Sequence, residues 1–534
     1  MPKLTIDGEE LEVPSGTTIL QAALGRGQEI PHYCYHPGLS VAGNCRMCLV
    51  EVEKAPKLVI ACSVPVTDGM VVNTDNERVK EAQAAVQEFL LINHPLDCPI
   101  CDQAGECRLQ DYAFSHSTGK SRFVEEKLKL NKAVDIGHHV TLDQERCIQC
   151  SRCIRFCDEV TKTGELAFFE RGNQAQIGIH PGKRLNNPYS GNVVDICPVG
   201  ALTLKEFRFE TRIWYLENTP SVCAGCARGC NVMVSVGNKQ KEMTSPGQFD
   251  DRIKRLVPRV NHAVNGHWMC DEGRLSYQRL DAAPRLLSAQ APQGALIEWE
   301  QAIVTGAAQI KQAAQSGRAA AILSPRLTCE TMFAWKDLFD ELGGVRFGIE
   351  RIASGEDDDL LLRADKGANS TGASWILGER ADAEAIVDAA TSGKIDTLIM
   401  VADPLDPEDT RRLPENLLLK VKNVIYVGPF LDQTAESASL LIPAAAWAAE
   451  DGTMVNFEGR VQLVRRCHMP RGEGRPGWRV VEDLREAAGL ESRGWTSSAD
   501  VLESLAKNVT PFEGITEGRI GLLGARGVAA AAGS

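Results

Sequence analysis

The chain has 534 residues, which predicts about three or four domains rather than one core. Hydrophobic residues make up 43% and charged residues 24%, as in a soluble globular protein, and the net charge of −13, with acidic and basic residues interspersed, argues against nucleic acid as the main partner. No stretch approaches the roughly 18 continuous apolar residues of a membrane span, and Met1–Asp7 lacks the apolar core of a signal peptide, so we expect membrane contact only through partner proteins.

Cysteines carry most of the chemistry that the sequence can support. The chain contains 18 of them, in groups whose spacing is typical of metal ligands. Only Cys157, Cys329 and Cys467 stand outside four ligand sets. Disulfide frameworks belong to small secreted domains, so the pattern favours a cytosolic metalloprotein.

The first set lies in residues 1–78. Alternating strand patterns at 3–6 and 10–13 lead to a short helix for which Thr17 or Thr18 is the predicted N-cap. The first set follows, and consists of Cys34, Cys45, Cys48 and Cys62. Strands, a helix and a cysteine loop predict a β-grasp ferredoxin domain that binds [2Fe–2S]. Ten residues separate Cys34 from Cys45 where a plant-type ferredoxin has four, so the domain is not a simple plant-type ferredoxin, and a zinc site is the alternative.

The second set lies in residues 79–139. The sequence predicts a helix over 78–93, and its apolar face is formed by Val79, Ala82, Val86, Phe89 and Leu90. The loop after this helix carries the second set, His94, Cys98, Cys101 and Cys107. Three cysteines leave a [4Fe–4S] cluster one ligand short, which makes His94 the candidate donor, although a lone histidine is more often a surface or core residue. An imidazole in place of a thiolate removes a negative charge and should raise the cluster's potential.

The third set lies in residues 140–215. It consists of Cys147, Cys150, Cys153 and the distant Cys197, which Pro198 follows. Three cysteines two residues apart with a remote Cys-Pro are typical of [4Fe–4S] ligation. Five cysteines cannot hold two such clusters, and Cys157 is followed by Asp158 rather than proline, so we expect Cys157 to pack.

The fourth set lies in residues 216–275 and consists of Cys223, Cys226, Cys230 and Cys270. By spacing alone, these four thiolates fit [4Fe–4S] or structural zinc equally well. The alternating stretch 231–236 beside them predicts a strand.

The pattern changes beyond residue 275. Helical stretches at 299–314 and 383–390 alternate with apolar strands at 319–323, 397–401 and 423–427, which predicts an α/β domain with a parallel sheet. No G-x-G-x-x-G motif or phosphate loop is present, so we expect no nucleotide site. Residues 521–534 are rich in glycine and alanine and predict a flexible tail.

These motifs together identify a family. Through the first three sets the chain resembles the large iron–sulfur subunit of bacterial respiratory complex I, the G subunit of NADH-quinone oxidoreductase. The resemblance implies one [2Fe–2S] cluster on the first set and [4Fe–4S] clusters on the second and third, with His94 as a ligand. It also favours [4Fe–4S] over zinc at the fourth set, which gives three [4Fe–4S] clusters in all.

The C-terminal half is more loosely similar to molybdopterin oxidoreductases. The matching pieces are 324–330, 402–404, 441–443 and 450–460. The resemblance implies a domain that has lost its cofactor, so no molybdopterin is expected and Cys329 is expected to pack.

The expected fold class is multidomain α/β and α+β. The expected domains are a β-grasp [2Fe–2S] domain (1–78), a helical [4Fe–4S] segment (79–139), a ferredoxin-like [4Fe–4S] domain (140–215), a small four-cysteine domain (216–275), a molybdopterin-oxidoreductase-like α/β domain (276–520) and a tail (521–534).

The implied function is electron relay within NADH:quinone oxidoreductase, with no catalytic acid, base or nucleophile on this chain. The expected partners are other peripheral-arm subunits of complex I, including the flavin- and NADH-binding subunit and the quinone-side iron–sulfur subunits. The expected location is peripheral, on the cytoplasmic side of the bacterial inner membrane. The alternatives are an electron-relay subunit of a soluble NAD-linked formate dehydrogenase or hydrogenase, and a zinc-stapled scaffold without redox function.

Overall fold

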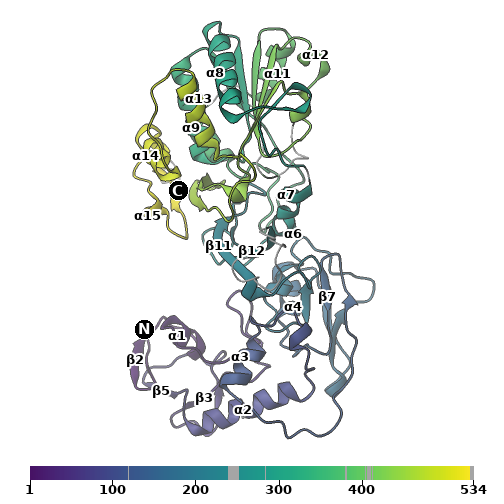
Figure 1. Cartoon of the computed structure of the whole chain (residues 1–534). Coiled ribbons are helices and arrows are strands. Elements are labelled where there is room, and N and C mark those ends of the chain that lie inside the picture. Colours follow the sequence, from purple (N-terminus) through teal and green to yellow (C-terminus); the bar gives the residue numbers. More distant parts are fainter. Residues whose placement is uncertain are drawn as a thin grey trace. The chain divides into compact units, whose positions relative to one another are not determined.

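The computed structural model describes residues 1–117, 119–237, 252–282, 284–378, 382–402, 405, 411 and 413–528. The chain divides into two compact units, Met1–Leu216 and Glu217–Ser534 (Figure 1). Of the helices within the described ranges, none combines the length and the apolar character needed to cross a bilayer.

The first unit begins with a five-stranded sheet beside one helix. Its strands are β1 (Lys3–Ile6), β2 (Glu9–Glu12), β3 (Leu49–Val52), β4 (Val59–Ile60) and β5 (Met70–Asn73), in the order β2-β1-β5-β3-β4. Strand β1 pairs antiparallel with β2 and parallel with β5. Helix α1 (Ile19–Gly25) begins after Thr18, whose hydroxyl accepts a hydrogen bond from the Gln21 backbone N–H at 3.3 Å. Of the two predicted N-caps, Thr17 and Thr18, the structure therefore selects Thr18.

Helix α2 (Glu77–Ile92) follows and confirms the predicted helix, but its buried face is partly polar. Gln83 and Gln87 are buried, whereas Phe89 is 74% exposed, so the prediction that Phe89 faces the core is wrong. The Gln87 side chain accepts a hydrogen bond from the Tyr33 hydroxyl at 2.6 Å. Buried amides are tolerated when they are hydrogen-bonded, and this exception to the apolar pattern joins α2 to the loop of the first set.

The rest of the first unit consists of short elements. They are η1 (Cys98–Ile100), α3 (Arg108–Ser115), β6 (Val134–Asp135), β7 (Val140–Leu142), α4 (Arg152–Arg155), η2 (Phe156–Val160), β8 (Leu166–Phe169), η3 (Gly172–Gln174), β9 (Gln176–Ile179), α5 (Asn192–Asp195), β10 (Leu202–Leu204) and η4 (Ile213–Tyr215). Strands β10, β7 and β6 form one small sheet in that order, and β8 pairs with β9. The segments that carry the predicted metal ligands are therefore mostly loops held between small sheets and helices.

The second unit begins with a three-stranded sheet that frames the fourth set. Its strands are β11 (Leu216–Val222), β12 (Asn231–Gly237) and β13 (Ile253–Pro258), in that order. The short helices α6 (Asp271–Leu275), η5 (Ser276–Gln278) and α7 (Arg279–Ala282) follow. Strand β12 confirms the strand predicted at 231–236.

A seven-stranded sheet forms the centre of the second unit, in the order β15-β14-β20-β19-β18-β16-β17. Its strands are β14 (Gln290–Ala291), β15 (Ala295–Leu296), β16 (Ala319–Leu323), β17 (Val345–Ile349), β18 (Thr397–Val401), β19 (Asn423–Gly428) and β20 (Leu440–Pro443). The five strands from β16 to β20 are parallel, which confirms the predicted parallel sheet. In the predicted 402–404 piece, Asp403 and Pro404 lie outside the described residues.

Helices cover both faces of this sheet (Figure 1). Helices α8 (Trp299–Gln315), α9 (Cys329–Leu342) and α13 (Gly477–Ala487) lie on one face, and α11 (Ala383–Thr391) and α12 (Glu415–Leu418) lie on the other. Helices α10 (Ser370–Leu377) and α14 (Ser498–Asn508) pack against α9, and α15 (Glu517–Ile520) packs against β22 (Arg460–Val464). Alternate strand residues face opposite sides: Ile399 packs in the cluster with α8, α9 and α13, whereas Leu398 packs in the cluster with α11 and α12. Both predicted helices, 299–314 and 383–390, are confirmed as α8 and α11.

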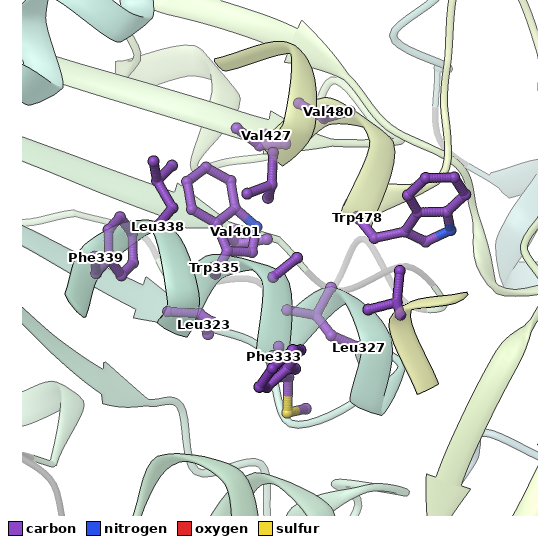
Figure 2. Packing of buried hydrophobic residues seen from close by; sticks show 14 of the residues in the cluster. Leu323, Leu327, Phe333, Trp335, Leu338, Phe339, Val401, Val427, Trp478 and Val480 are labelled. Carbon is purple, nitrogen blue, oxygen red and sulfur yellow. The ribbon is translucent and has the colours of Figure 1, made fainter. Parts of the chain in front are cut away.

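Aromatic residues of α9 fill the larger cluster (Figure 2). Trp335 is fully buried, and its ring centroid lies 5.2 Å from that of Phe339. Leu323, Val401 and Val427, at the ends of three adjacent parallel strands, belong to the same cluster. This cluster therefore joins one face of the sheet to the helices that cover it.

The second unit contains a further three-stranded sheet, β21 (Gly452–Val455), β22 (Arg460–Val464) and β23 (Ala525–Arg526). Because Ala525 pairs with Val461, the predicted flexible tail begins too early. Backbone hydrogen bonding to β22 orders this part of a glycine- and alanine-rich segment, and residues 529–534 lie outside the described range.

Candidate metal centres

The first set lies on the loops around β3 and β4. Cys34, Cys48 and Cys62 are buried and Cys45 is half-buried. The four side chains lie close together: hydrogen bonds with the Cys45 and Cys62 thiols lower the pKa of Cys34, and a hydrogen bond with Cys62 lowers that of Cys48. The structure thus brings all four predicted ligands to one place.

The second set lies on the loop from α2 to α3. Cys98 is exposed, Cys101 and Cys107 are buried, and the three thiols influence one another electrostatically. Burial, with the nearby charges of Arg146 and Lys127, lowers the pKa of His94 to about 4. The imidazole is therefore neutral at pH 7, the form in which histidine binds metals. Coordination by His94 stays a prediction.

The third set surrounds one cavity. Cys147, Cys150, Cys153 and Cys197 all line it, with apolar residues from β7 and β10. Within the cysteine run, Gln149 and Ser151 adopt positive φ angles of 55° and 61°, and these turns curl the backbone around the cavity. Cys157 does not line this cavity; it is buried, and burial raises its pKa to about 12.

The fourth set also surrounds one cavity. Cys223, Cys226 and Cys230 come from the loop between β11 and β12, and Cys270 is the N-cap of α6; all four line the cavity. The Gly225 backbone N–H donates to Cys223 Sγ at 3.4 Å.

The first three sets meet in one apolar cluster. Buried members of this cluster include Cys34 of the first set, Cys107 of the second and Cys150 of the third, and partly buried Cys45, Cys147 and Cys197 pack against them. Predicted ligands more than 100 residues apart in sequence therefore share one hydrophobic environment.

Two observations test whether the donor sets fit iron–sulfur clusters. First, burial raises the pKa of Cys107 and Cys150 to about 11 and that of Cys223 to about 12, so at neutral pH these thiols ionise only when a cation binds them. Second, a Cβ atom on Gly273 would lie 3.0 Å from Cys223 Sγ, so glycine keeps space for the sulfur. Buried thiols with room for their sulfur atoms are donors that iron–sulfur clusters use.

The cysteines outside the sets have other surroundings. Cys329 is fully buried in the core of the second unit, and the Asn369 side-chain amide donates to its Sγ at 3.3 Å. The Cys467 thiol donates to the Arg465 carbonyl oxygen at 3.3 Å.

Two residues with roles at these centres were missed in the sequence. Arg146 is 4% exposed in its side chain and forms ion pairs with Asp97 and Asp143 at 2.9 and 3.2 Å, which connects the second-set loop to the start of the third set. Gly200 lies so close to the second set that a Cβ atom there would be 2.2 Å from Cys101 Sγ. Their only sequence signals are that Arg146 directly precedes Cys147 and that Gly200 follows Cys197 by three residues.

Five family models match the chain. They are a 2Fe-2S iron-sulfur cluster binding domain (residues 2–77), the NADH-ubiquinone oxidoreductase-G iron-sulfur binding region (83–122), the ferredoxin-like domain of NADH-quinone oxidoreductase subunit 3 (137–203), a molybdopterin oxidoreductase Fe4S4 domain (216–282) and molybdopterin oxidoreductase (363–487). The order of these matched domains along the chain confirms the predicted multidomain fold class.

Curated relatives carry names that agree with these family models. The G subunit of NADH-quinone oxidoreductase from Rickettsia conorii is 32% identical over 636 aligned positions, which cover 96% of this chain and 92% of that relative. The Rickettsia felis protein of the same name is 42% identical over 66% of this chain, and that alignment spans 51% of the relative's length. The mitochondrial NADH-ubiquinone oxidoreductase 78 kDa subunit of Candida albicans is 31% identical over 91% of this chain and 82% of its own.

Among solved structures, a chain of an NAD+-reducing [NiFe]-hydrogenase is 30% identical over 40% of this chain and 91% of its own, with a TM-score of 0.36. That score is too low to add to the assignment. The Rickettsia conorii match extends over almost the whole of both chains. The chain therefore belongs to the family of NADH-quinone oxidoreductase G subunits.

Proposed function

We propose that this chain is the electron-relay subunit of an NADH:quinone oxidoreductase and holds four iron–sulfur clusters. The proposed ligands are the first set for [2Fe–2S], and the second, third and fourth sets for one [4Fe–4S] each. When bound, the clusters supply one-electron redox chemistry that links a flavin on a partner subunit to a quinone-reducing partner.

One observation carries the proposal: the first, second and third sets contribute cysteines to a single apolar cluster. Electron transfer between centres requires them to be near one another, whereas independent structural zinc sites have no such requirement. The chain's own residues do the remaining work, because they bind the clusters, fix their spacing and exclude water.

The fourth set lies in the other unit, and we propose a structural role for its cluster. Cys270 caps α6, and its Sγ accepts a hydrogen bond from the Gly273 backbone N–H at 3.3 Å, so a cluster there would tie α6 to the β11–β12 loop.

The proposed partners are other peripheral-arm subunits of complex I, including the flavin- and NADH-binding subunit and the quinone-side iron–sulfur subunits. Names of the relatives support this assignment. We place the complex at the cytoplasmic face of the bacterial inner membrane, with this chain attached only through those partners. We also propose that the domain resembling molybdopterin oxidoreductases binds no molybdopterin.

Metal content tests the proposal. Anaerobically purified protein should contain about fourteen iron atoms with matching acid-labile sulfide, and dithionite should produce a [2Fe–2S] EPR signal beside [4Fe–4S] signals. Cys197→Ala should remove about four irons and one [4Fe–4S] signal. Cys157→Ala is the matched control, because this cysteine belongs to the same run but does not line the cavity, and it should leave both unchanged.

The result also separates the alternatives. About ten irons with one zinc would support the relay and make the fourth set a zinc site. Zinc throughout, without an EPR signal, would refute the electron-relay function.

A further inference from the structure

Arg152 occupies an unusual position in the third set. It begins the short helix α4 between Cys150 and Cys153. Arg152 is among the residues that line the cavity surrounded by the four cysteines of the third set, and its charge interacts with Cys150 and Cys197. A positively charged group is thus placed where a cluster carrying four thiolates would lie.

The Arg152 guanidinium holds two ligand loops. Its Nη1 donates to the Ile196 carbonyl oxygen at 3.0 Å, and its Nη2 donates to the Tyr35 carbonyl oxygen at 2.5 Å. Ile196 directly precedes Cys197 of the third set, and Tyr35 directly follows Cys34 of the first. One side chain therefore fixes backbone next to ligands of two sets.

The third nitrogen of the same group is left over. Arg152 Nε is buried and has no hydrogen-bond partner among the described residues. No aspartate or glutamate within the described ranges forms an ion pair with Arg152. A buried cation and a buried unpaired donor are both costly, so the cavity calls for an anion that accepts a hydrogen bond. An iron–sulfur cluster with thiolate ligands has that charge and that capacity.

We propose that Arg152 tunes the potential of the cluster on the third set. Its Nε–H donates a hydrogen bond to a sulfur of the cluster, and its charge stabilises the reduced, more negative form. Both effects raise the reduction potential. This inference rests on the proposed function, which assigns a [4Fe–4S] cluster to the third set.

Arg155 is a matched control on the same helix. Its Nη2 donates to the Cys34 carbonyl oxygen at 2.5 Å, so it also holds the loop of the first set. Its Nε already donates to the Ser151 hydroxyl at 3.2 Å, and Arg155 does not line the cavity. Replacing Arg155 removes one positive charge and one loop contact, as replacing Arg152 does. It does not remove an N–H that lacks a hydrogen-bond partner.

The test is an EPR-monitored redox titration of the full-length protein, purified anaerobically. Loss of a signal in Cys197→Ala identifies the third-set cluster. In Arg152→Met, the ratio of reduced to oxidised cluster at a fixed potential should fall about tenfold. For a one-electron couple, this corresponds to a reduction potential that is lower by about 59 mV. Arg152→Lys keeps the charge but lacks the Nε–H, so it should shift the ratio in the same direction by less. Arg155→Met should shift it by less than either.

The possible outcomes are distinct. If Arg152→Met fails to assemble the cluster, the comparison of Arg152→Lys with Arg155→Met decides. Shifts in the Arg152 variants no larger than in Arg155→Met would overturn the role of Arg152 while leaving the electron-relay function intact. If Cys197→Ala removes neither iron nor a signal, the proposed ligand set fails instead.

Discussion

Replacing Gly200 with alanine tests how closely the second and third sets are packed. Gly200 lies in the segment after Cys197, yet the atom that it approaches is the sulfur of Cys101, a proposed ligand of the second set. An alanine Cβ would lie 2.2 Å from Cys101 Sγ, whereas ordinary contacts begin at 3.4 Å, so the sulfur or the loop must retreat by the difference, about 1.2 Å. Gln103 Cβ, 3.1 Å away, limits movement on the same side.

The expected cost follows from this overlap. Overpacking of a core typically costs about 1–3 kcal/mol. Metal–thiolate bonds are about 2.3 Å long, and a displacement of about 1 Å is incompatible with one. We therefore expect Gly200→Ala to lose about four irons and the EPR signal of the second set.

Iron and sulfide analysis with EPR on anaerobic protein measures both effects. Gly25→Ala is the control, because a Cβ atom there has nothing within 4 Å, and that variant should keep its full iron content. A Gly200→Ala protein with full iron and an unchanged second-set signal would refute the reasoning that Gly200 keeps space for Cys101.

Three further predictions concern the second unit. Cys270→Ser should lose about four irons and lower the yield of folded protein more than turnover in the complex; a large loss of turnover in well-folded protein would contradict a structural role for the fourth cluster. Trp335→Ala, in the core of α9, should cost about 3–5 kcal/mol in urea unfolding, and a change below about 1 kcal/mol would contradict the packing described. Burial raises the pKa of Glu330 from its usual 4.5 to about 8, so its contribution to stability is complete below about pH 4.5 and is lost as pH rises towards 8. Glu330→Gln should therefore flatten the fall in urea midpoint over that range, and an unchanged pH profile would contradict this assignment.

The sequence predicted elements wherever a local pattern decides the structure. Strand β16, for example, is a continuous apolar run and forms as predicted, because both faces of a parallel strand are buried. Helix α2 was placed correctly but its buried face was not, since Gln87 is buried through a partner, Tyr33, that lies 54 residues away in sequence. Periodicity contains no information about such distant partners.

The proposed ligand sets show the same difference between local features, which the sequence predicts, and distant contacts, which it does not. Spacing within the run from Cys147 to Cys153 is local, and the structure places these residues around one cavity with Cys197. The surroundings of the ligands were not predictable, because Arg146, Arg152 and Gly200 act through contacts with segments far away in the chain. Charged and small residues beside a cysteine have no spacing rule that distinguishes them from ordinary loop residues.

The shared apolar cluster of the first three sets has a consequence for the folding of the first unit. Its members span the chain from Tyr33 to Ala201, so its contacts join segments that lie far apart in sequence. Such contacts form only after long loops have closed, which costs chain entropy. We therefore expect this cluster to complete its packing late in folding, after local elements such as helix α2 have formed.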